Sequence, residues 1–284
     1  ITWCYPGGYG LQPAIIFYRQ PGAEVGGPIT ERKGGIEMKR GHRSLIVALV
    51  AVVLGVALAL LATRGQGSLA ANGTIYVDAD ATGASNGSSW ADAYTDLQVA
   101  LNAAVAEDEV WVAEGIYKPT QEFSPSDPRS VAFKLKNGVA IYGGFDPSTG
   151  DVGMEDRNWE ANTTILSGDI GTQGADSDNS YHVLYHPAGT DLDSSAILDG
   201  FTITGGNANG DISPHRDGGG MYNDGSSPLL ANCTFSANSA TYNGGAMLND
   251  HSASPSLANC VFEGNSAGSG GGLYNANVSS PALG

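Results

Sequence analysis

A repeat of 26 residues constrains the fold of this 284-residue sequence more than any other feature. The hexapeptide Gly-Gly-Gly-Met-Tyr-Asn at 218–223 returns as Gly-Gly-Ala-Met-Leu-Asn at 244–249 and as Gly-Gly-Gly-Leu-Tyr-Asn at 270–275. Asn-Cys-Thr-Phe at 232–235 likewise returns as Asn-Cys-Val-Phe at 259–262, and the one extra residue of this interval falls in a turn. Such a period is too short for a propeller blade and contains no helix-length segment. The repeats therefore predict an all-β fold, a right-handed parallel β-helix solenoid with one coil per repeat.

In such a solenoid, equivalent residues of successive coils stack about 4.8 Å apart and form ladders. We expect the apolar residues of the repeat to form interior ladders. Asparagine at a tight corner tolerates a left-handed backbone, and stacked amides can hydrogen-bond along the axis. The expected interior ladders are Met221 over Met247 over Leu273, Phe235 over Phe262 and Cys233 over Cys260, and the expected turn ladder is Asn223 over Asn249 over Asn275.

The chain before the repeats predicts less regular coils. Short segments at 74–77, 109–113, 139–142, 164–166 and 183–185 are expected to be strands, and residues 209–217 form an insertion after a coil that aligns with the repeat. Residues 95–98 have the sequence of a helix capping box, and Leu97, Ala100, Leu101 and Ala104 follow helical spacing. We expect one amphipathic helix that covers the N-terminal end of the solenoid, where core and strand edges would otherwise be exposed.

The first 70 residues are predicted to lie outside the folded domain. Residues 38–43 are mostly basic, 45–62 are apolar or glycine, and small residues follow at Ser68 and Ala70, which is typical of a secretory signal peptide. The apolar run also reaches the lower length limit of a spanning helix, so an uncleaved membrane anchor is the alternative. We interpret 1–37 as untranslated or non-structural, 38–70 as signal peptide or anchor, and 71–284 as the β-helix, with a further copy that starts near 276 and is cut short.

The charge balance argues against nucleic acid as a partner. The chain has 13 basic and 29 acidic residues, a net charge of -16. Without residues 1–73, six basic and 26 acidic residues remain, so the exported part carries -20 and repels phosphate backbones. We expect a secreted or cell-surface monomer whose candidate partners are polysaccharides and other cell-surface ligands. Attachment to a membrane would need the uncleaved anchor or a module beyond residue 284.

Asp224 and Asp250 follow the ladder asparagines and are the sharpest catalytic candidates in the sequence. Stacking would bring them about 5 Å apart, near the separation of the carboxylate pair of a retaining glycosidase. Repulsion would then raise one of the two pKa values, or a calcium ion could bridge the pair. The alternative is a solvated turn whose side chains splay apart, and the third coil has Ala276 at this position.

The insertion supplies a second candidate set, Arg216 and Asp217. A polysaccharide lyase needs an Arg or Lys base beside a uronate carboxylate and acidic residues for calcium, and Asp211 could complete such a group. The sequence lacks the Asn-Thr-Asp, Asp-Asp and Gly-His-Gly motifs of polygalacturonases. A solvated loop is therefore the alternative.

Other chemistry-bearing residues favour structural roles. Cys233 and Cys260 would lie within disulfide range, but we expect free buried thiols because the repeat uses them as small apolar residues. His182 and His186 would lie about 13 Å apart on a strand, too far to share a metal. No cofactor is required by these patterns, and calcium is the one metal that we consider. Loop carboxylates that could bind it are Asp176, Asp178, Asp191 and Asp193, and tyrosines that could stack on sugars or pack between coils are Tyr222, Tyr242 and Tyr274.

The repeats resemble a known family. Phe-x-x-Asn at 235–238 and 262–265, with Gly-Gly-Ala-Met at 244–247, is similar to the paired motifs of the polymorphic outer membrane proteins. Residues 75–206, including Ser-Trp-Ala-Asp-Ala-Tyr at 89–94, resemble the N-terminal part of bacterial right-handed parallel β-helix repeat proteins of the pectin-lyase-like superfamily. The resemblance implies a β-helix, export and surface display, often with an adhesive role. It implies no catalysis.

Two functions are consistent with the sequence. The first is a secreted or cell-surface scaffold with an adhesive or binding role, associated with the outer membrane if the family resemblance extends to attachment. The second is an extracellular polysaccharide lyase or glycoside hydrolase that works in a groove along the solenoid. Carboxylates that converge with an Arg or Lys on one exposed face would favour the enzyme, whereas scattered carboxylates would favour the scaffold.

Overall fold

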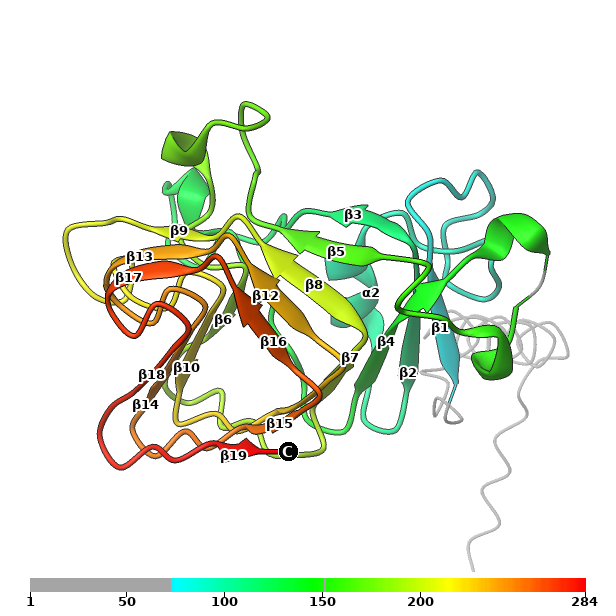
Figure 1. Ribbon diagram of the computed structural model, residues 1–284. Helices are drawn as coiled ribbons and strands as arrows, with labels where there is room; N and C mark the ends of the chain where they lie inside the picture. The colour runs from blue at the N-terminus through cyan, green and yellow to red at the C-terminus, as the bar shows by residue number, and fades with distance from the viewer. Residues whose placement is uncertain (1–72, 151) are drawn as a thin grey trace, which may run out of the picture. The chain divides into compact units, whose positions relative to one another are not determined.

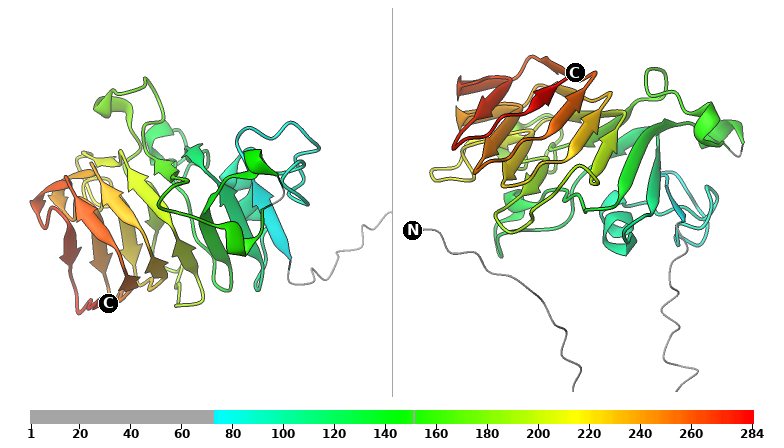
Figure 2. Two further views of the ribbon diagram at one scale, coloured as in Figure 1. Left: turned by 45° about the vertical axis from the view of Figure 1, so that its right-hand side comes forward. Right: turned by 90° about the horizontal axis from the view of Figure 1, so that it is seen from below.

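The computed structural model describes residues 73–150 and 152–284, which form a stack of parallel strands (Figures 1 and 2). The predictions for residues 1–37 and 38–70 lie outside these described residues. Within 73–150 and 152–284, no helix is long and apolar enough to cross a membrane. The predicted fold class, an all-β parallel solenoid with one short α-helix, is confirmed.

Four sheets run along the stack, and the paired strands within each of them are parallel. The seven-stranded sheet consists of β1 (Thr74–Val77), β2 (Glu109–Ala113), β4 (Ala140–Phe145), β7 (Ile197–Asp199), β11 (Leu229–Ala231), β15 (Ser256–Ala258) and β19 (Ala282–Leu283). The five-stranded sheet consists of β3 (Gly115–Tyr117), β5 (Thr164–Ser167), β8 (Phe201–Thr204), β12 (Thr234–Ser236) and β16 (Val261–Glu263). The four-stranded sheet consists of β6 (Leu184–His186), β10 (Met221–Asp224), β14 (Met247–Asp250) and β18 (Leu273–Asn275), and the three-stranded sheet of β9 (Asn207–Ala208), β13 (Ser239–Asn243) and β17 (Ser266–Ser269).

Each regular coil visits all four sheets in turn, from β10 through β11, β12 and β13 before β14 begins the next coil (Figure 1). The register of these pairs places Met221 opposite Met247, and Met247 opposite Leu273, inside the coil. Phe235 pairs with Phe262 in the same way, and their rings stack with centroids 5.1 Å apart. Met221, Met247 and Phe235 are fully buried. The repeat period therefore corresponds to one turn of the solenoid.

The glycines that open each repeat motif allow the chain to turn between the three-stranded and four-stranded sheets. The first glycine of each motif, at 218, 244 and 270, has a positive φ of 61° to 65°, which L residues adopt at a cost. The second glycine packs against neighbouring backbone, because a Cβ on Gly219 would lie 2.2 Å from the carbonyl oxygen of Ser239. The repeat therefore needs glycine at these two positions for different reasons.

The helix near the N-terminus is α2 (Leu97–Ala103), which follows β1 and packs on β1 and β2. Leu97, Ala100 and Leu101 are buried and belong to the main hydrophobic core. The predicted capping box is wrong by one residue, because the side chain of Asp96, not that of Thr95, accepts the hydrogen bond from the Gln98 backbone N–H. Asp is as good an N-cap as Thr, and here its carboxylate reaches the N2 amide.

The five predicted upstream strands all form, with small shifts in their ends. β1 and β2 match the predicted bounds, and β5 extends one residue further than expected. β4 begins at Ala140 and continues to Phe145, and β6 runs from Leu184 to His186 rather than from 183 to 185. The shift of β6 places His186 in the strand, in register with Asn223 of the next coil.

Candidate functional site

Asp224 and Asp250 occupy paired positions at the ends of β10 and β14, as the repeat predicts. The imidazole of His251 lies between them, with its Nδ1 2.9 Å from Oδ1 of Asp224 and 3.4 Å from Oδ2 of Asp250. Asn277 Nδ2 also donates a hydrogen bond of 2.6 Å to Oδ1 of Asp250. The two carboxylates are therefore held by an imidazole and an amide in a surface turn, rather than facing each other across an open gap. His251 was not predicted from the sequence to belong to this group.

The second candidate set is part of the packing between coils. Asp217 is buried, and its Oδ1 accepts hydrogen bonds from the backbone N–H of Asn243 at 3.2 Å and from its Nδ2 at 2.9 Å. Arg216 Nε lies 3.8 Å from Asp217 Oδ2, and its guanidinium lies 4.2 Å from the centre of the Tyr242 ring. Asp217 thus joins the insertion to β13, and Arg216 packs on an exposed ring.

The three tyrosines do not form one sugar-stacking face. Tyr222 lies on β10, where it is buried, and Leu248 separates it from Tyr274 in the four-stranded sheet. Tyr242 lies on β13 of a different sheet and is half-exposed. Burial, together with the Asp224 and Asp250 carboxylates, raises the pKa of Tyr222 to about 12. This phenol is therefore protonated at neutral pH.

The histidines and loop carboxylates make local hydrogen bonds. His182 Nδ1 contacts the carbonyl of Gly218 at 2.9 Å, and His186 Nδ1 contacts Asn223 Oδ1 at 2.7 Å. Asp178 Oδ2 accepts from the Thr172 backbone at 2.8 Å. In residues 73–150 and 152–284, no group of three or more His, Cys, Asp and Glu side chains is placed to hold a metal ion. Calcium therefore stays a prediction.

Cys233 and Cys260 are free thiols on adjacent coils. The Val261 backbone N–H donates to the Cys233 carbonyl at 2.8 Å, which holds the two coils in register at this point. Burial raises the pKa of the Cys233 thiol, and the adjacent Cys233 thiol lowers the pKa of the half-buried Cys260.

A polar groove on the outer face of the five-stranded sheet combines an exposed aromatic ring with several hydrogen-bonding groups. Its volume is about 420 Å³, within the range of ligand sites. Its floor contains Thr202 of β8, Thr234 of β12 and Val261 of β16, which are register neighbours on successive coils. We name it the Trp159 groove, and its other lining side chains include Trp159, Glu160, Asn232 and Asn259.

Two glycines make room for Trp159, Gly200 in the turn between β7 and β8 and Gly144 within β4. Gly200 has a φ of +80°, and a Cβ there would lie 2.2 Å from Nη2 of Arg157 and 2.9 Å from Cβ of Trp159. A Cβ on Gly144 would lie 2.6 Å from Cα of Trp159. The loop between β4 and β5 can therefore approach the solenoid wall only because these positions lack side chains.

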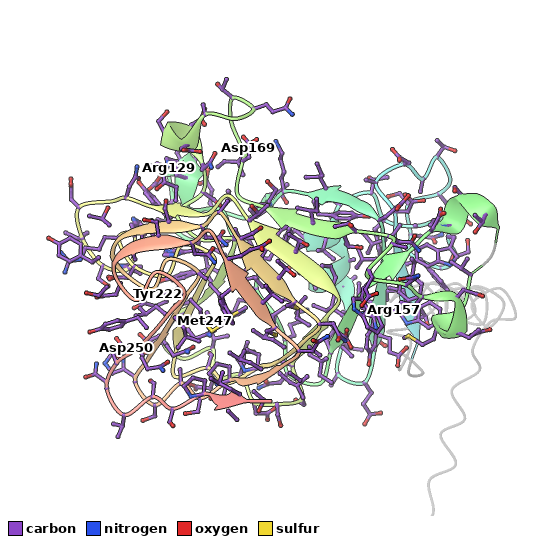
Figure 3. All side chains as sticks on the ribbon, viewed as in Figure 1. Arg129, Arg157, Asp169, Tyr222, Met247 and Asp250 are labelled. Carbon is purple, nitrogen blue, oxygen red and sulfur yellow. The ribbon has the colours of Figure 1, made fainter. Side chains whose placement is uncertain are left out.

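The Arg157 side chain packs against the Trp159 indole and fixes its position. Its Nη2 forms an ion pair with Asp199 Oδ1 at 2.7 Å, and both side chains are largely buried. Its guanidinium also lies 4.8 Å from the centre of the Trp159 indole, close enough for a cation–π contact. The indole itself is 36% exposed. Arg157 and Asp250 lie on opposite sides of the view in Figure 3, so the groove and the carboxylate turn are separate sites.

An amide ladder forms one edge of the Trp159 groove. Asn232 Nδ2 donates to Asp199 Oδ1 at 2.8 Å, and Asn259 Nδ2 donates to Asn232 Oδ1 at 2.8 Å. Both asparagines have positive φ, 50° and 51°, and they occupy the turn that Gly200 occupies one coil earlier. This site was not predicted from the sequence, because Trp159 lies outside the repeat. The sequence feature that could have indicated it is Gly200, which stands where later coils have asparagine and therefore leaves space beside its own coil.

Comparison with known proteins supports the repeat and leaves the site unassigned. Residues 259–276 match the Chlamydia polymorphic membrane protein repeat. This segment contains Phe262, Asn265 and the third glycine motif, so the predicted resemblance is confirmed there. Comparison with curated proteins gave no match. One similar solved structure is a rhamnogalacturonan lyase, with 12% sequence identity and a TM-score of 0.25. The match covers 71% of this chain and 62% of the lyase chain, which is less than two thirds of the lyase.

Proposed function

We propose that this chain is a secreted or cell-surface β-helix scaffold with an adhesive or binding role. The polymorphic membrane protein repeat at 259–276 and the export signal predicted at 38–70 support a location outside the cytoplasm. Stacked coils make a stiff rod whose outer faces repeat at regular intervals, which suits a binding surface. We expect this role to need no cofactor, and the experiment below tests the binding with and without calcium.

The observation that carries the proposal is how the candidate catalytic side chains are used. Asp217 is buried and bonded to Asn243, and Asp224 and Asp250 share the imidazole of His251. A lyase or hydrolase needs an acid and a base that face a bound substrate. These carboxylates instead connect one coil to the next, whereas the Trp159 groove offers hydrogen-bonding groups and an aromatic ring for binding.

The test measures binding and turnover on the same samples. The purified chain is incubated with intact bacterial and animal cells and with neutral and acidic polysaccharides, with calcium and with a chelator. Retained protein and new reducing or unsaturated ends are both measured. We expect binding without turnover in both conditions. Product formation that is lost in Asp224→Ala or Arg216→Ala would show that the chain is an enzyme.

A further inference from the structure

We propose that the Trp159 groove binds a neutral polysaccharide, with one sugar ring stacked on the indole of Trp159 and the chain running along the solenoid axis. This inference rests on the proposed binding role and adds the ligand class and the residues that contact it. It is carried by the aromatic ring, the polar floor and the charge of the groove.

The indole provides the apolar part of the site. One face of a sugar ring carries mainly C–H groups, which pack on a flat aromatic surface, while its hydroxyls remain free for hydrogen bonds. Trp159 is the exposed ring in the groove, and the Arg157 guanidinium stacks on it at 4.8 Å. Since Arg157 is fixed by Asp199 and by the Gly143 carbonyl, the indole is held before a ligand arrives. Arg157 is thus a positioning residue.

The floor and edge provide hydrogen bonds at the spacing of the coils. Thr202 and Thr234 present hydroxyl groups that both donate and accept. Asn232 and Asn259 form the edge of the groove, and their side-chain amides lie on adjacent coils of the ladder. Adjacent strands lie about 4.8 Å apart, so the three coils from β8 to β16 span about 10 Å, enough for a short oligosaccharide.

The charge of the groove selects a neutral ligand. Of the described residues that line it, Glu160 is the ionisable one, and it is exposed. Arg157 lies beneath Trp159, where Asp199 already neutralises it. A uronate chain would therefore meet one carboxylate and no free cation, on a domain of strongly negative net charge. A neutral chain of hydroxyl-rich sugars meets no such repulsion.

The experiment is affinity gel electrophoresis of the full chain in gels that contain a β-glucan, a mannan, a galactan, polygalacturonate or alginate. We expect at least one neutral polysaccharide to retard the protein, and the two uronates to leave its mobility unchanged. Trp159→Ala should weaken the binding at least tenfold, and Trp159→Phe should restore part of it. Tyr242→Ala is the matched control, because Tyr242 is also an exposed ring on an Arg guanidinium but lies outside the groove.

A second readout does not depend on how the alanine variant folds. Of the tryptophans in residues 73–150 and 152–284, Trp90 and Trp111 pack within an aromatic cluster, so a ligand in the groove should protect Trp159, rather than these two, from fluorescence quenching by acrylamide. Retardation by a neutral polysaccharide that Trp159→Ala leaves unchanged, with no protection from acrylamide, would overturn the groove site and leave the scaffold role standing. Equal retardation by uronates would overturn the neutral ligand class. Retardation by no neutral polysaccharide would overturn the inference, and the scaffold role would then depend on binding to cells alone.

Discussion

Acidification should destabilise this protein through two buried histidines. His182 and His186 are 3% and 0% exposed, and burial lowers their pKa values to about 3 and about 4. The contacts of His186 explain why its neutral form is favoured. The Leu135 backbone N–H donates to Nε2 at 3.3 Å, so Nε2 must be the acceptor, and Nδ1–H donates to Asn223 Oδ1 at 2.7 Å. A proton on Nε2 would remove that acceptor, and nearby Lys134 also disfavours the charge.

The sign and size of the effect follow from the two pKa values. At pH 7 the imidazoles are mostly neutral in both states, so little stability is lost. Below pH 6.5, the ordinary pKa of histidine, both imidazoles become protonated in the unfolded chain. In the folded chain they stay neutral down to about pH 4 for His186 and about pH 3 for His182. Stability therefore falls as the pH falls through this window, and at pH 5 each histidine costs about 2 kcal/mol. His215, whose pKa is also lowered by burial, acts in the same direction.

The assay is urea unfolding at pH 7 and pH 5 at constant ionic strength, followed by circular dichroism. A loss of about 4 kcal/mol with a slope of about 3 kcal/mol per molar lowers the midpoint by about 1.3 M. His186→Asn, which can donate to Asn223 and accept from Leu135, should remove about half of this pH dependence. His251→Asn, at a position 62% exposed, keeps both buried imidazoles and should retain it. Equal midpoint shifts in the wild type and in His186→Asn would refute the reasoning.

Three further changes test the packing of the coils, each by urea unfolding at pH 7. Asn249→Ala removes the middle of a buried amide ladder and should lower the free energy of unfolding by about 2 kcal/mol. Asn275→Ala, at an exposed position, should lower it by less than about 1 kcal/mol. Equal losses in the two variants would contradict a cooperative ladder. Gly200→Ala should lower the free energy of unfolding more than Gly174→Ala does. Both glycines have a positive φ, but only a Cβ at position 200 would contact other atoms. Gly200→Ala should also weaken the binding of a ligand in the groove. Phe235→Ala should cost about 3 to 5 kcal/mol, and a loss below about 1 kcal/mol would place this ring outside the core.

The fold could be predicted from the repeats because each repeat residue has the same environment in every coil. Phe235 and Phe262 are 27 residues apart and still pair, since the extra residue lies in a turn and leaves the strands in register. The upstream coils lack this redundancy, so the ends of β4 and β6 could be placed only to within a few residues. The one-residue shift of β6 has a large consequence, because it brings His186 into contact with Asn223.

The candidate site was harder to predict because it depends on contacts between unlike segments. Pairing of Asp224 with Asp250 follows from the period, but the position of His251 between them depends on the conformation of a turn, where it has a positive φ of 49°. Trp159 lies in a loop without repeat or periodicity. Its approach to the wall depends on a glycine some 40 residues later in the chain, and no local pattern reports such a contact.

Two of the asparagine ladders run in opposite directions, and the residue at the head of each explains why. The predicted turn position of the Asn223 ladder is wrong, because its asparagines lie within strands β10, β14 and β18 and have no positive φ. In this ladder, Asn223 Nδ2 donates forward to Asn249, and Asn249 donates forward to Asn275. In the groove ladder, Asn259 Nδ2 donates back to Asn232, and Asn232 Nδ2 donates back to Asp199. The heads of the two ladders differ in chemistry and are, respectively, His186 and Asp199.

A neutral imidazole whose Nε2 already accepts a backbone bond can only donate from Nδ1, so the first amide must turn its oxygen toward it. A carboxylate can only accept, so the first amide must turn its nitrogen toward it. Each later amide repeats the orientation of the one before, because a stacked donor needs an acceptor opposite it. An aspartate buried against an arginine therefore fixes the direction in which each amide of the groove ladder donates.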